Sequence, residues 1–162
     1  MSAKPPEGKG KAGRGPDVAT NRAARFAYEL VETFEAGVVL RGTEVKSLRE
    51  GKARLQDAYA VIEDGELYLR GSYIPPYPPA RENHEPERPR KLLLHRWEIE
   101  RLLGRMQRKG LTLIPTRIYF RGRNAKVELA LARGKDQADK RRAIRDRDVA
   151  RDVERELKGR YR

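Results

Sequence analysis

The 162-residue sequence contains no cysteine, only two histidines and only three serines. The absence of cysteine excludes disulfides, thiolate chemistry and cysteine-ligated metal sites, and it is compatible with a reducing compartment. His84 and His95 would need carboxylates to complete a metal site, and no glycine motif of the P-loop kind is present. We therefore expect no metal and no other cofactor, and a binding protein rather than an enzyme.

Long apolar runs are also missing. No segment approaches the ~18 apolar residues of a membrane span, and the N-terminus lacks the apolar stretch of a signal peptide. We expect a cytoplasmic protein that does not enter a membrane. Hydrophobic and charged residues each make up 38% of the chain, against ~45–50% and ~25% in average globular proteins. One domain with a modest core and solvated tails is therefore expected.

What the sequence has in excess is positive charge, with a formal net charge of +13. A phosphate backbone is the commonest partner of such a surface, because each phosphate contact releases counterions. An anionic membrane would also attract the charge, and the charge would also promote solubility. Since solubility does not require so large an excess, we favour nucleic acid as the partner.

The chain divides into three parts. Residues 1–20 combine basic residues with glycine and proline, and they are predicted to be disordered because they bury too little apolar area to offset their ordering entropy. Residues 21–134 form the predicted RNA-binding domain. Residues 135–162 form a charged tail with apolar residues every four positions from Val149 to Tyr161. So narrow a stripe is marginally stable as a lone helix. We predict a tail that is disordered when free and helical against a partner; a helix packed on the body is the alternative.

Short periodic segments predict the strands of the domain. A strand is expected near 26–40, a hairpin over 55–70 around Asp64-Gly65, and two further strands over 111–120 and 126–131. Gly122 and Asn124 are expected in the turn between the last two. Closure of such strands removes their edges, so the predicted fold is mainly β, an OB-like antiparallel β-barrel with two or three added helices and a basic C-terminal tail.

Two helices and one long loop complete the predicted domain. A short helix is expected with Thr43 as its N-cap and Gly51 as the C′ residue after its end. A longer helix is expected over 96–109, with Trp97 in its apolar stripe. The proline-rich loop 75–91 is expected to be either functional or disordered. Its basic end, with Arg88, Arg90 and Lys91, would hold a phosphate backbone or form a solvated patch.

Several segments, in the same order, resemble the SmpB family. They are Asn21-Arg22, Phe34-Glu35-Ala36-Gly37, the run from Gly42 to Ala53, Arg90-Lys91-Leu92-Leu93-Leu94-His95 and Asp139-Lys140-Arg141. The resemblance covers residues 20–162, and the Gly42–Ala53 run is long enough to be specific.

The resemblance implies an RNA-binding protein that is not an enzyme. Members of the family bind the tRNA-like domain of tmRNA and, with elongation factor Tu, deliver alanyl-tmRNA to stalled ribosomes. Their tail enters the decoding centre, against small-subunit RNA, and the empty mRNA channel. The implied function is thus a role in trans-translation. The alternative is another OB-barrel protein that binds RNA or associates with ribosomes.

The resemblance also implies particular RNA-binding residues. Glu35 would accept hydrogen bonds from base or ribose, Leu93 would contact an unstacked base, and His95 would donate a hydrogen bond or stack. The alternatives are structural, with Leu93 in the core and His95 as a helix cap. The full predicted RNA-binding set is Tyr28, Glu35, Arg90, Lys91, Leu93, His95, Gly134 and Lys135.

Three tail residues, Asp139, Lys140 and Arg141, match the family motif used on the ribosome after tmRNA has bound. The sequence departs from the family beside this motif. Asp136 stands where the family often has a lysine, and Ala138 stands where an aromatic residue or histidine often precedes the motif. A ring that stacks on ribosomal RNA in relatives would therefore be missing in this chain.

Overall fold

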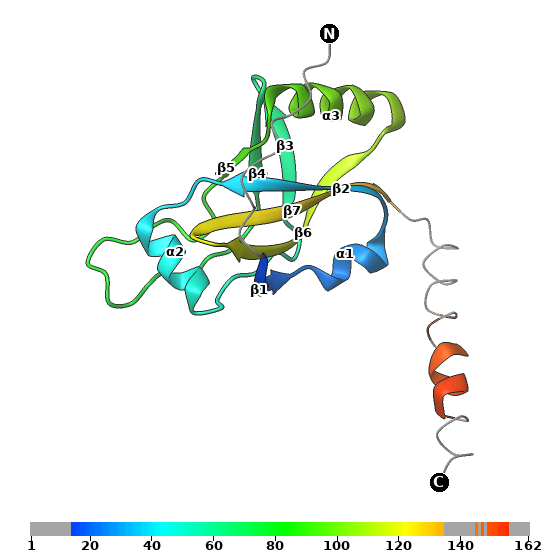
Figure 1. Ribbon diagram of the computed structural model, residues 1–162, viewed down its shortest axis with the longest axis horizontal. Coiled ribbons are helices and arrows are strands. Elements are labelled where there is room, and N and C mark those ends of the chain that lie inside the picture. The colour runs from blue at the N-terminus through cyan, green and yellow to red at the C-terminus, as the bar shows by residue number, and fades with distance from the viewer. Residues whose placement is uncertain (1–13, 135–144, 146, 148, 156–162) are drawn as a thin grey trace.

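The computed structural model describes residues 14–134, 145, 147 and 149–155. Antiparallel strands form a ring, with three helices around it (Figure 1). The strands are β1 (Arg14–Thr20), β2 (Tyr28–Val38), β3 (Tyr59–Glu63), β4 (Glu66–Arg70), β5 (Arg90–Leu93), β6 (Thr112–Arg121) and β7 (Asn124–Gly134). The helices are α1 (Arg22–Ala27), α2 (Gly42–Arg49) and α3 (Arg96–Lys109).

Six of the strands form the ring, in the order β6-β3-β4-β5-β2-β7, and the β6–β7 pair closes it. Two joints in the ring are short: β3 pairs with β6 through Ala60 and Leu113, and β2 pairs with β5 through two residue pairs. The prediction of a mainly β, barrel-like fold with added helices is confirmed. The OB barrel itself has five strands, so this ring is a six-stranded variant of that architecture.

The prediction that residues 1–20 form a disordered tail is wrong for residues 14–20, which form β1 on the outside of β6. Strand pairing with β6 satisfies the backbone of this segment, and Val18 and Ala19 add partial burial against the core. The partner strand lies a hundred positions further along the sequence, so local composition could not indicate the pairing. Residues 1–13 lie outside the described residues.

A bulge in β2 between Leu30 and Glu32 changes which side of the sheet its side chains face. One extra residue shifts the alternation of side chains. Leu30 therefore packs beneath α1, whereas Phe34 packs against the core of the ring. The same shift places Glu35 on the outer face. The bulge explains why the sequence of this strand is only imperfectly amphipathic.

Two apolar clusters hold the domain together. The larger cluster fills the ring and reaches α2 through Leu48 and α3 through Leu102. The smaller cluster joins Ala24 of α1 to the outer side of β6 and β7, where Ala130 and Ala132 are fully buried. Helix α1, which the sequence did not predict, thus covers one outer face of the ring. None of the helices within the described ranges is long and apolar enough to cross a membrane.

The two predicted turns between strands have different outcomes. Asp64 and Gly65 have φ values of 51° and 77° and connect β3 to β4, so the predicted hairpin is confirmed. The turn between β6 and β7 consists of Gly122 and Arg123. The prediction that Asn124 belongs to this turn is wrong, because Asn124 is already paired in the ladder.

The C-terminal ends of α2 and α3 follow the prediction, but the start of α2 and one face of α3 do not. Thr43, expected as the N-cap of α2, lies inside the helix, which begins at Gly42 after Arg41 as the N-cap. Gly51 after α2 and Gly110 after α3 have φ values of 75° and 61°, as expected for residues that end a helix. In α3, Ile99 and Leu102 face the core. Trp97, predicted to lie in the same stripe, is 56% exposed. It lies on the opposite side of the helix.

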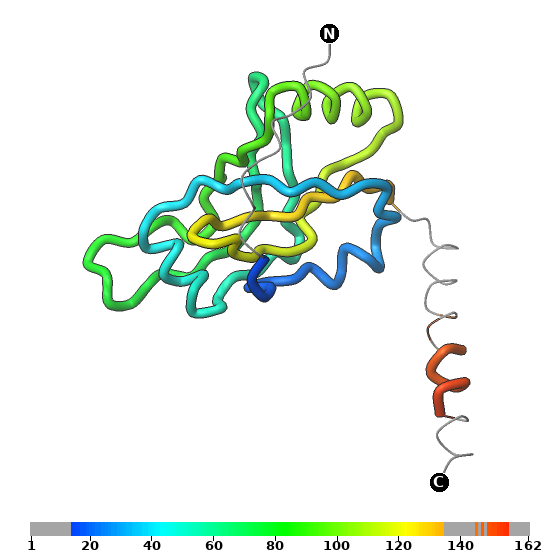
Figure 2. The backbone as a smooth tube through the Cα atoms, viewed as in Figure 1, coloured from blue at the N-terminus to red at the C-terminus, as the bar shows by residue number. Residues whose placement is uncertain are grey.

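The long loop between β4 and β5 lies beside α2 (Figure 2). His84, which is 3% exposed, forms hydrogen bonds of 2.8 Å with the Thr43 hydroxyl and with the Ile74 carbonyl. The Ser47 hydroxyl donates a hydrogen bond of 2.7 Å to the Pro75 carbonyl. These buried polar contacts fasten both ends of the loop to α2, so this segment is part of the folded domain.

Candidate nucleic-acid interface

The outer face of β2 brings Glu35 close to Leu93. Side chains alternate along a strand, so positions 35 and 37 share one face. Gly37 pairs with Leu93 of β5 on one side and with Lys126 of β7 on the other. Leu93 is 52% exposed. This exposure excludes the alternative that Leu93 is a core residue.

The Glu35 carboxylate is held by two residues of β6. The Tyr119 hydroxyl and the Arg121 guanidinium both donate to Glu35 Oε2, the latter at 2.8 Å. Partial burial alone would raise the pKa of Glu35, but the hydrogen bonds from Arg121 and Tyr119 outweigh it and lower that pKa. Burial and the hydrogen bond to Glu35 raise the pKa of Tyr119 to about 12. At neutral pH the pair is therefore a carboxylate and a neutral phenol. We call Glu35, Leu93, Tyr119, Arg121 and Lys126 the Glu35 surface.

A second carboxylate, that of Glu128, lies directly opposite Glu35 in the β2–β7 pair. Like charges in this position repel each other. The Arg117 guanidinium, 2.7 Å from Glu128 Oε1, and the Thr116 hydroxyl compensate by donating to Glu128. They lower the pKa of Glu128 although its burial acts in the opposite direction. The outer face is thus a row of paired carboxylates and guanidiniums with both hydrogen-bond donors and acceptors.

His95 lies immediately before α3, close in sequence to Leu93. Its backbone N–H donates to the Glu98 carboxylate at 3.2 Å, so its main chain takes part in the start of the helix. Its side chain is exposed. The imidazole ring lies parallel to the Trp97 indole, with ring centroids 6.2 Å apart. The sequence therefore correctly placed His95 at a helix cap, and the ring itself is available to a partner.

Tyr28 and Gly134 lie together at the far end of the β2–β7 pair, directly opposite each other. Tyr28 packs partly against the small cluster under α1. Gly134 is exposed and is the last residue of β7. The structure thus brings these two predicted residues together where the domain ends and the charged tail begins.

The prediction that Arg90 contacts RNA is corrected by its burial. Arg90 is 1% exposed and its Nε donates to the Glu44 carboxylate, which is fully buried. Its other donors bind the Ser72 carbonyl at 2.9 Å and the Pro86 carbonyl at 3.0 Å. All of its donor groups are directed inward, where they join α2 to β5 and the long loop. Because its partner Glu44 lies 46 positions away, no local sequence pattern indicated that Arg90 would be buried.

The neighbours of Arg90 are nearer the surface. Arg88 is half-buried and also donates to Glu44. Lys91 is more exposed, with its Nζ 3.0 Å from the Glu66 carboxylate of β4. Of the predicted basic cluster, Lys91 is therefore the residue best placed to reach an RNA phosphate.

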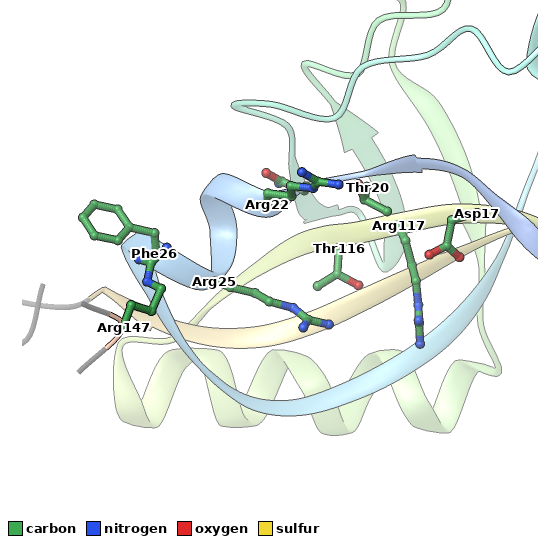
Figure 3. Close-up of a pocket in the computed structure, with 9 residues that line it drawn as sticks. Asp17, Thr20, Arg22, Arg25, Phe26, Thr116, Arg117 and Arg147 are labelled. Carbon is green, nitrogen blue, oxygen red and sulfur yellow. The ribbon is translucent and has the colours of Figure 1, made fainter. Parts of the chain in front are cut away.

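A cavity of about 590 Å³ lies on another part of the surface, where α1 meets β1 and β6 (Figure 3). We call it the arginine pocket, because four arginines and one aspartate are its charged lining residues. Its lining consists of Asp17, Thr20, Asn21, Arg22, Arg25, Phe26, Thr116, Arg117 and Arg147. These residues come from β1, α1, β6 and the C-terminal segment, so no local sequence pattern could have revealed the pocket.

The structure describes only residues 145, 147 and 149–155 of the predicted ribosome-binding tail. Lys135, Asp139, Lys140 and Arg141 lie outside the described residues, and their roles stay predictions. The Arg147 guanidinium lies 5.4 Å from the centre of the Phe26 ring of α1. Residues 149–155 are helical without a partner, so the prediction of a tail that is disordered when free is wrong for these residues. Val149 and Val153 are 57% and 52% exposed. Within the described part of the chain, their apolar stripe is therefore not packed on the domain.

The strands form an antiparallel ring, and the chain carries a net charge of +13. Its surface presents exposed apolar and aromatic side chains and an arginine-lined cavity. These features are those of a nucleic-acid-binding β-barrel protein. The chain belongs to the SmpB protein family, whose model matches residues 18–159. This is a family of RNA-binding proteins that are not enzymes. The predicted family and the predicted absence of an enzymatic role are confirmed.

Individual relatives support the same assignment. The SsrA-binding protein of Syntrophomonas wolfei is 55% identical over 155 residues, covering 94% of this chain and 99% of the relative. That of Pelotomaculum thermopropionicum is 53% identical over 146 residues, covering 90% and 95%. A chain in the solved structure described as "tmRNA-SmpB: a journey to the center of the bacterial ribosome" is 53% identical, with a TM-score of 0.63, covering 78% of this chain and 93% of that one.

Proposed function

We propose that this protein binds tmRNA through the Glu35 surface and His95, and that it acts with tmRNA on the ribosome in trans-translation. Membership of the SmpB family and relatives that are named SsrA-binding proteins support this function. The observation that carries the site is the ionised Glu35 carboxylate, fixed by Tyr119 and Arg121 beside the exposed Leu93. An oriented carboxylate accepts hydrogen bonds from base N–H groups or ribose hydroxyls, and an exposed leucine contacts an unstacked base.

The RNA segment bound by this surface is the tRNA-like domain of tmRNA. A folded RNA is recognised mainly by its shape and its phosphates, with few base contacts. Lys91 beside the Glu35 surface and the arginines of the arginine pocket supply cations for those phosphates. The affinity will therefore fall steeply as salt is added.

On the ribosome, the domain and the tail have separate roles. The folded domain, now taken as residues 14–134, holds tmRNA while elongation factor Tu carries the alanyl-tmRNA. Residues 135–162 enter the decoding centre and the empty mRNA channel, where Lys135, Asp139, Lys140 and Arg141 contact small-subunit RNA. Binding to small-subunit RNA fixes the helix of residues 149–155 in place. All of these partners are cytoplasmic, and so is the protein.

The departures in the tail alter the expected ribosomal contacts. Ala138 offers no ring for stacking on ribosomal RNA, and Asp136 replaces a cation with an anion. Decoding-centre binding by this chain therefore depends more on the Asp139-Lys140-Arg141 motif and on the stripe of apolar residues that includes Val149 and Val153.

A truncation separates these roles experimentally. Removal of residues 139–162 should leave the affinity for the isolated tRNA-like domain within about twofold of that of the full chain. The same truncation should abolish tagging of a nascent peptide in a reconstituted trans-translation reaction. Loss of tRNA-like-domain binding on truncation would show that the tail, and not the Glu35 surface, holds tmRNA.

A further inference from the structure

Trp97 is the chain's single tryptophan, and it lies on the surface at the start of α3 with 56% of its area exposed. Burying large aromatic rings is a main source of stability in folded proteins. Ile99 and Leu102 of the same helix are buried in the core. The helix therefore packs on the core through Ile99 and Leu102, and Trp97 faces solvent without contributing to that packing.

The indole extends the candidate interface in a definite geometry. The His95 and Trp97 rings are nearly parallel, with an angle of 9° between their planes and 6.2 Å between their centroids. Stacked aromatic rings occur at such separations when they are offset. Leu93, two residues before His95, is 52% exposed. Leu93, His95 and Trp97 thus form a row of exposed apolar and aromatic residues at alternate positions of the chain from the end of β5 into α3.

We propose that Trp97 is a further RNA-contacting residue of this protein, on which an unpaired base of the bound tRNA-like RNA stacks, next to the base contact of His95. This inference rests on the proposed function and adds a residue to its site. Flat aromatic faces are the surfaces on which proteins hold unpaired bases. Arg96, between the two rings in sequence, has 92% of its side chain exposed, and its Nε lies 3.5 Å from the Glu100 carboxylate. An exposed pair of this kind is weak, so the Arg96 guanidinium can exchange Glu100 for the adjoining phosphate.

The single tryptophan is also the probe that tests the proposal. Fluorescence excited at a wavelength that tyrosine does not absorb reports on Trp97 alone. The full-length protein is titrated with the tRNA-like domain at constant salt, and binding is followed in parallel by gel shift. The proposal predicts that the indole emission is quenched with the same midpoint as the gel shift. Unchanged emission at saturation would overturn it.

Three variants distinguish stacking from apolar contact. Trp97→Leu keeps an apolar side chain without a ring and should lose about 5- to 150-fold in affinity, the range that corresponds to one stacked base. Trp97→Phe should retain most of the affinity, and Trp97→Ala should resemble Trp97→Leu. Since Trp97 is exposed, all three variants should unfold at the same denaturant concentration as the original protein.

The outcomes separate this inference from the proposed function. If the original protein selects the tRNA-like domain but Trp97→Leu binds it equally well, only the role of Trp97 is overturned. This outcome would also be obtained if the row contacted another protein instead of RNA. If the original protein does not prefer the tRNA-like domain to unrelated RNA, both the inference and the proposed function are overturned.

Discussion

Gly37 of β2 lies directly opposite Leu93 of β5, and a Cβ at position 37 would lie only 3.3 Å from the Leu93 Cβ. Glycine therefore leaves the space that Leu93 occupies on the outer face. The close approach of β2 and β5 at Gly37 therefore determines where the Leu93 side chain lies in the candidate interface.

A Gly37→Ala variant should weaken binding of the tRNA-like domain by about tenfold, which corresponds to a loss of 1.4 kcal/mol. The added methyl group displaces Leu93 by a few tenths of an ångström. The free energy of unfolding should change by less than about 1 kcal/mol, because the lower entropy of the unfolded chain offsets part of the crowding. Gel shift and urea unfolding measure the two quantities.

Gly104→Ala is the matched control for this prediction. A Cβ at position 104 in α3 meets no other atom within 4 Å. The variant should bind RNA as the original protein does and should be more stable by up to about 1 kcal/mol, since alanine favours helix. Equal affinity of both glycine variants would contradict the role assigned to Gly37.

The buried Glu44–Arg90 pair should be one of the most sensitive points for stability. Glu44→Ala should lower the free energy of unfolding by about 3–5 kcal/mol, because it leaves the buried Arg90 guanidinium without its anion. Urea denaturation measures the loss. The pKa of Glu44 is lowered in the fold by hydrogen bonds from Arg88, Arg41 and Arg90, against the effect of burial. Its contribution to stability is therefore present above the unfolded-state pKa and is lost as the pH falls through the lower folded-state pKa.

Two comparisons make the prediction for Glu44 specific. Glu66→Ala removes the exposed pair with Lys91 and should leave the free energy of unfolding nearly unchanged, because exposed ion pairs contribute little. The double variant Glu44→Leu with Arg90→Met removes both buried charges and should be more stable than Glu44→Ala alone. Equal losses for Glu44→Ala and Glu66→Ala would contradict the buried network.

Tyr119 should make the stability of the protein depend on pH in the alkaline range. Its pKa is about 12 in the fold and about 10 in an unfolded chain. A pKa that folding raises contributes stability that is complete below the unfolded value and is lost as the pH rises through the folded value. The free energy of unfolding should therefore fall between pH 10 and pH 12, by on the order of 2 kcal/mol from this residue.

Tyr119→Phe isolates the contribution of this hydroxyl. Unfolding of both proteins by urea at pH 9 and near pH 12 gives the change in stability of each. The original protein should lose more stability over this interval than the variant, because only the original protein carries the shifted phenol. Parallel losses in the two proteins would contradict a raised pKa of Tyr119 in the fold.

Local features of the sequence predicted the elements that local interactions determine. The Asp64-Gly65 hairpin, the C-terminal end of α2 and both ends of α3 depend on turn and cap residues within a few positions, and they are confirmed. Pairing between strands that are far apart in the sequence has no comparable local marker. β1 was taken for a disordered tail because its partner β6 lies a hundred residues away.

The candidate site shows the same division. Motif resemblance identified Glu35, Leu93 and His95, and the structure places all three on the surface at or beside the short joint between β2 and β5. The basic cluster at the end of the long loop suggested Arg90 as well, but Arg90 is buried with Glu44. An arginine that binds RNA and one that pairs with a buried glutamate look alike in a sequence, because the difference is made by a residue 46 positions away. The Tyr119–Glu35 contact and the arginine pocket were missed for the same reason.

The central claim is that the ionised carboxylate of Glu35 takes part in selecting the tRNA-like domain of tmRNA. The most direct measurement is a competition gel shift at fixed salt, in which the protein chooses between the tRNA-like domain and an unrelated RNA of equal length. Glu29→Gln is the matched control, since Glu29 is an exposed glutamate of the same strand paired with Arg133. The account predicts that the original protein and Glu29→Gln prefer the tRNA-like domain and that Glu35→Gln loses about tenfold or more of that preference, the effect of removing a charged hydrogen-bond acceptor. Equal binding of both RNAs by the original protein, or an unchanged preference in Glu35→Gln, would contradict it.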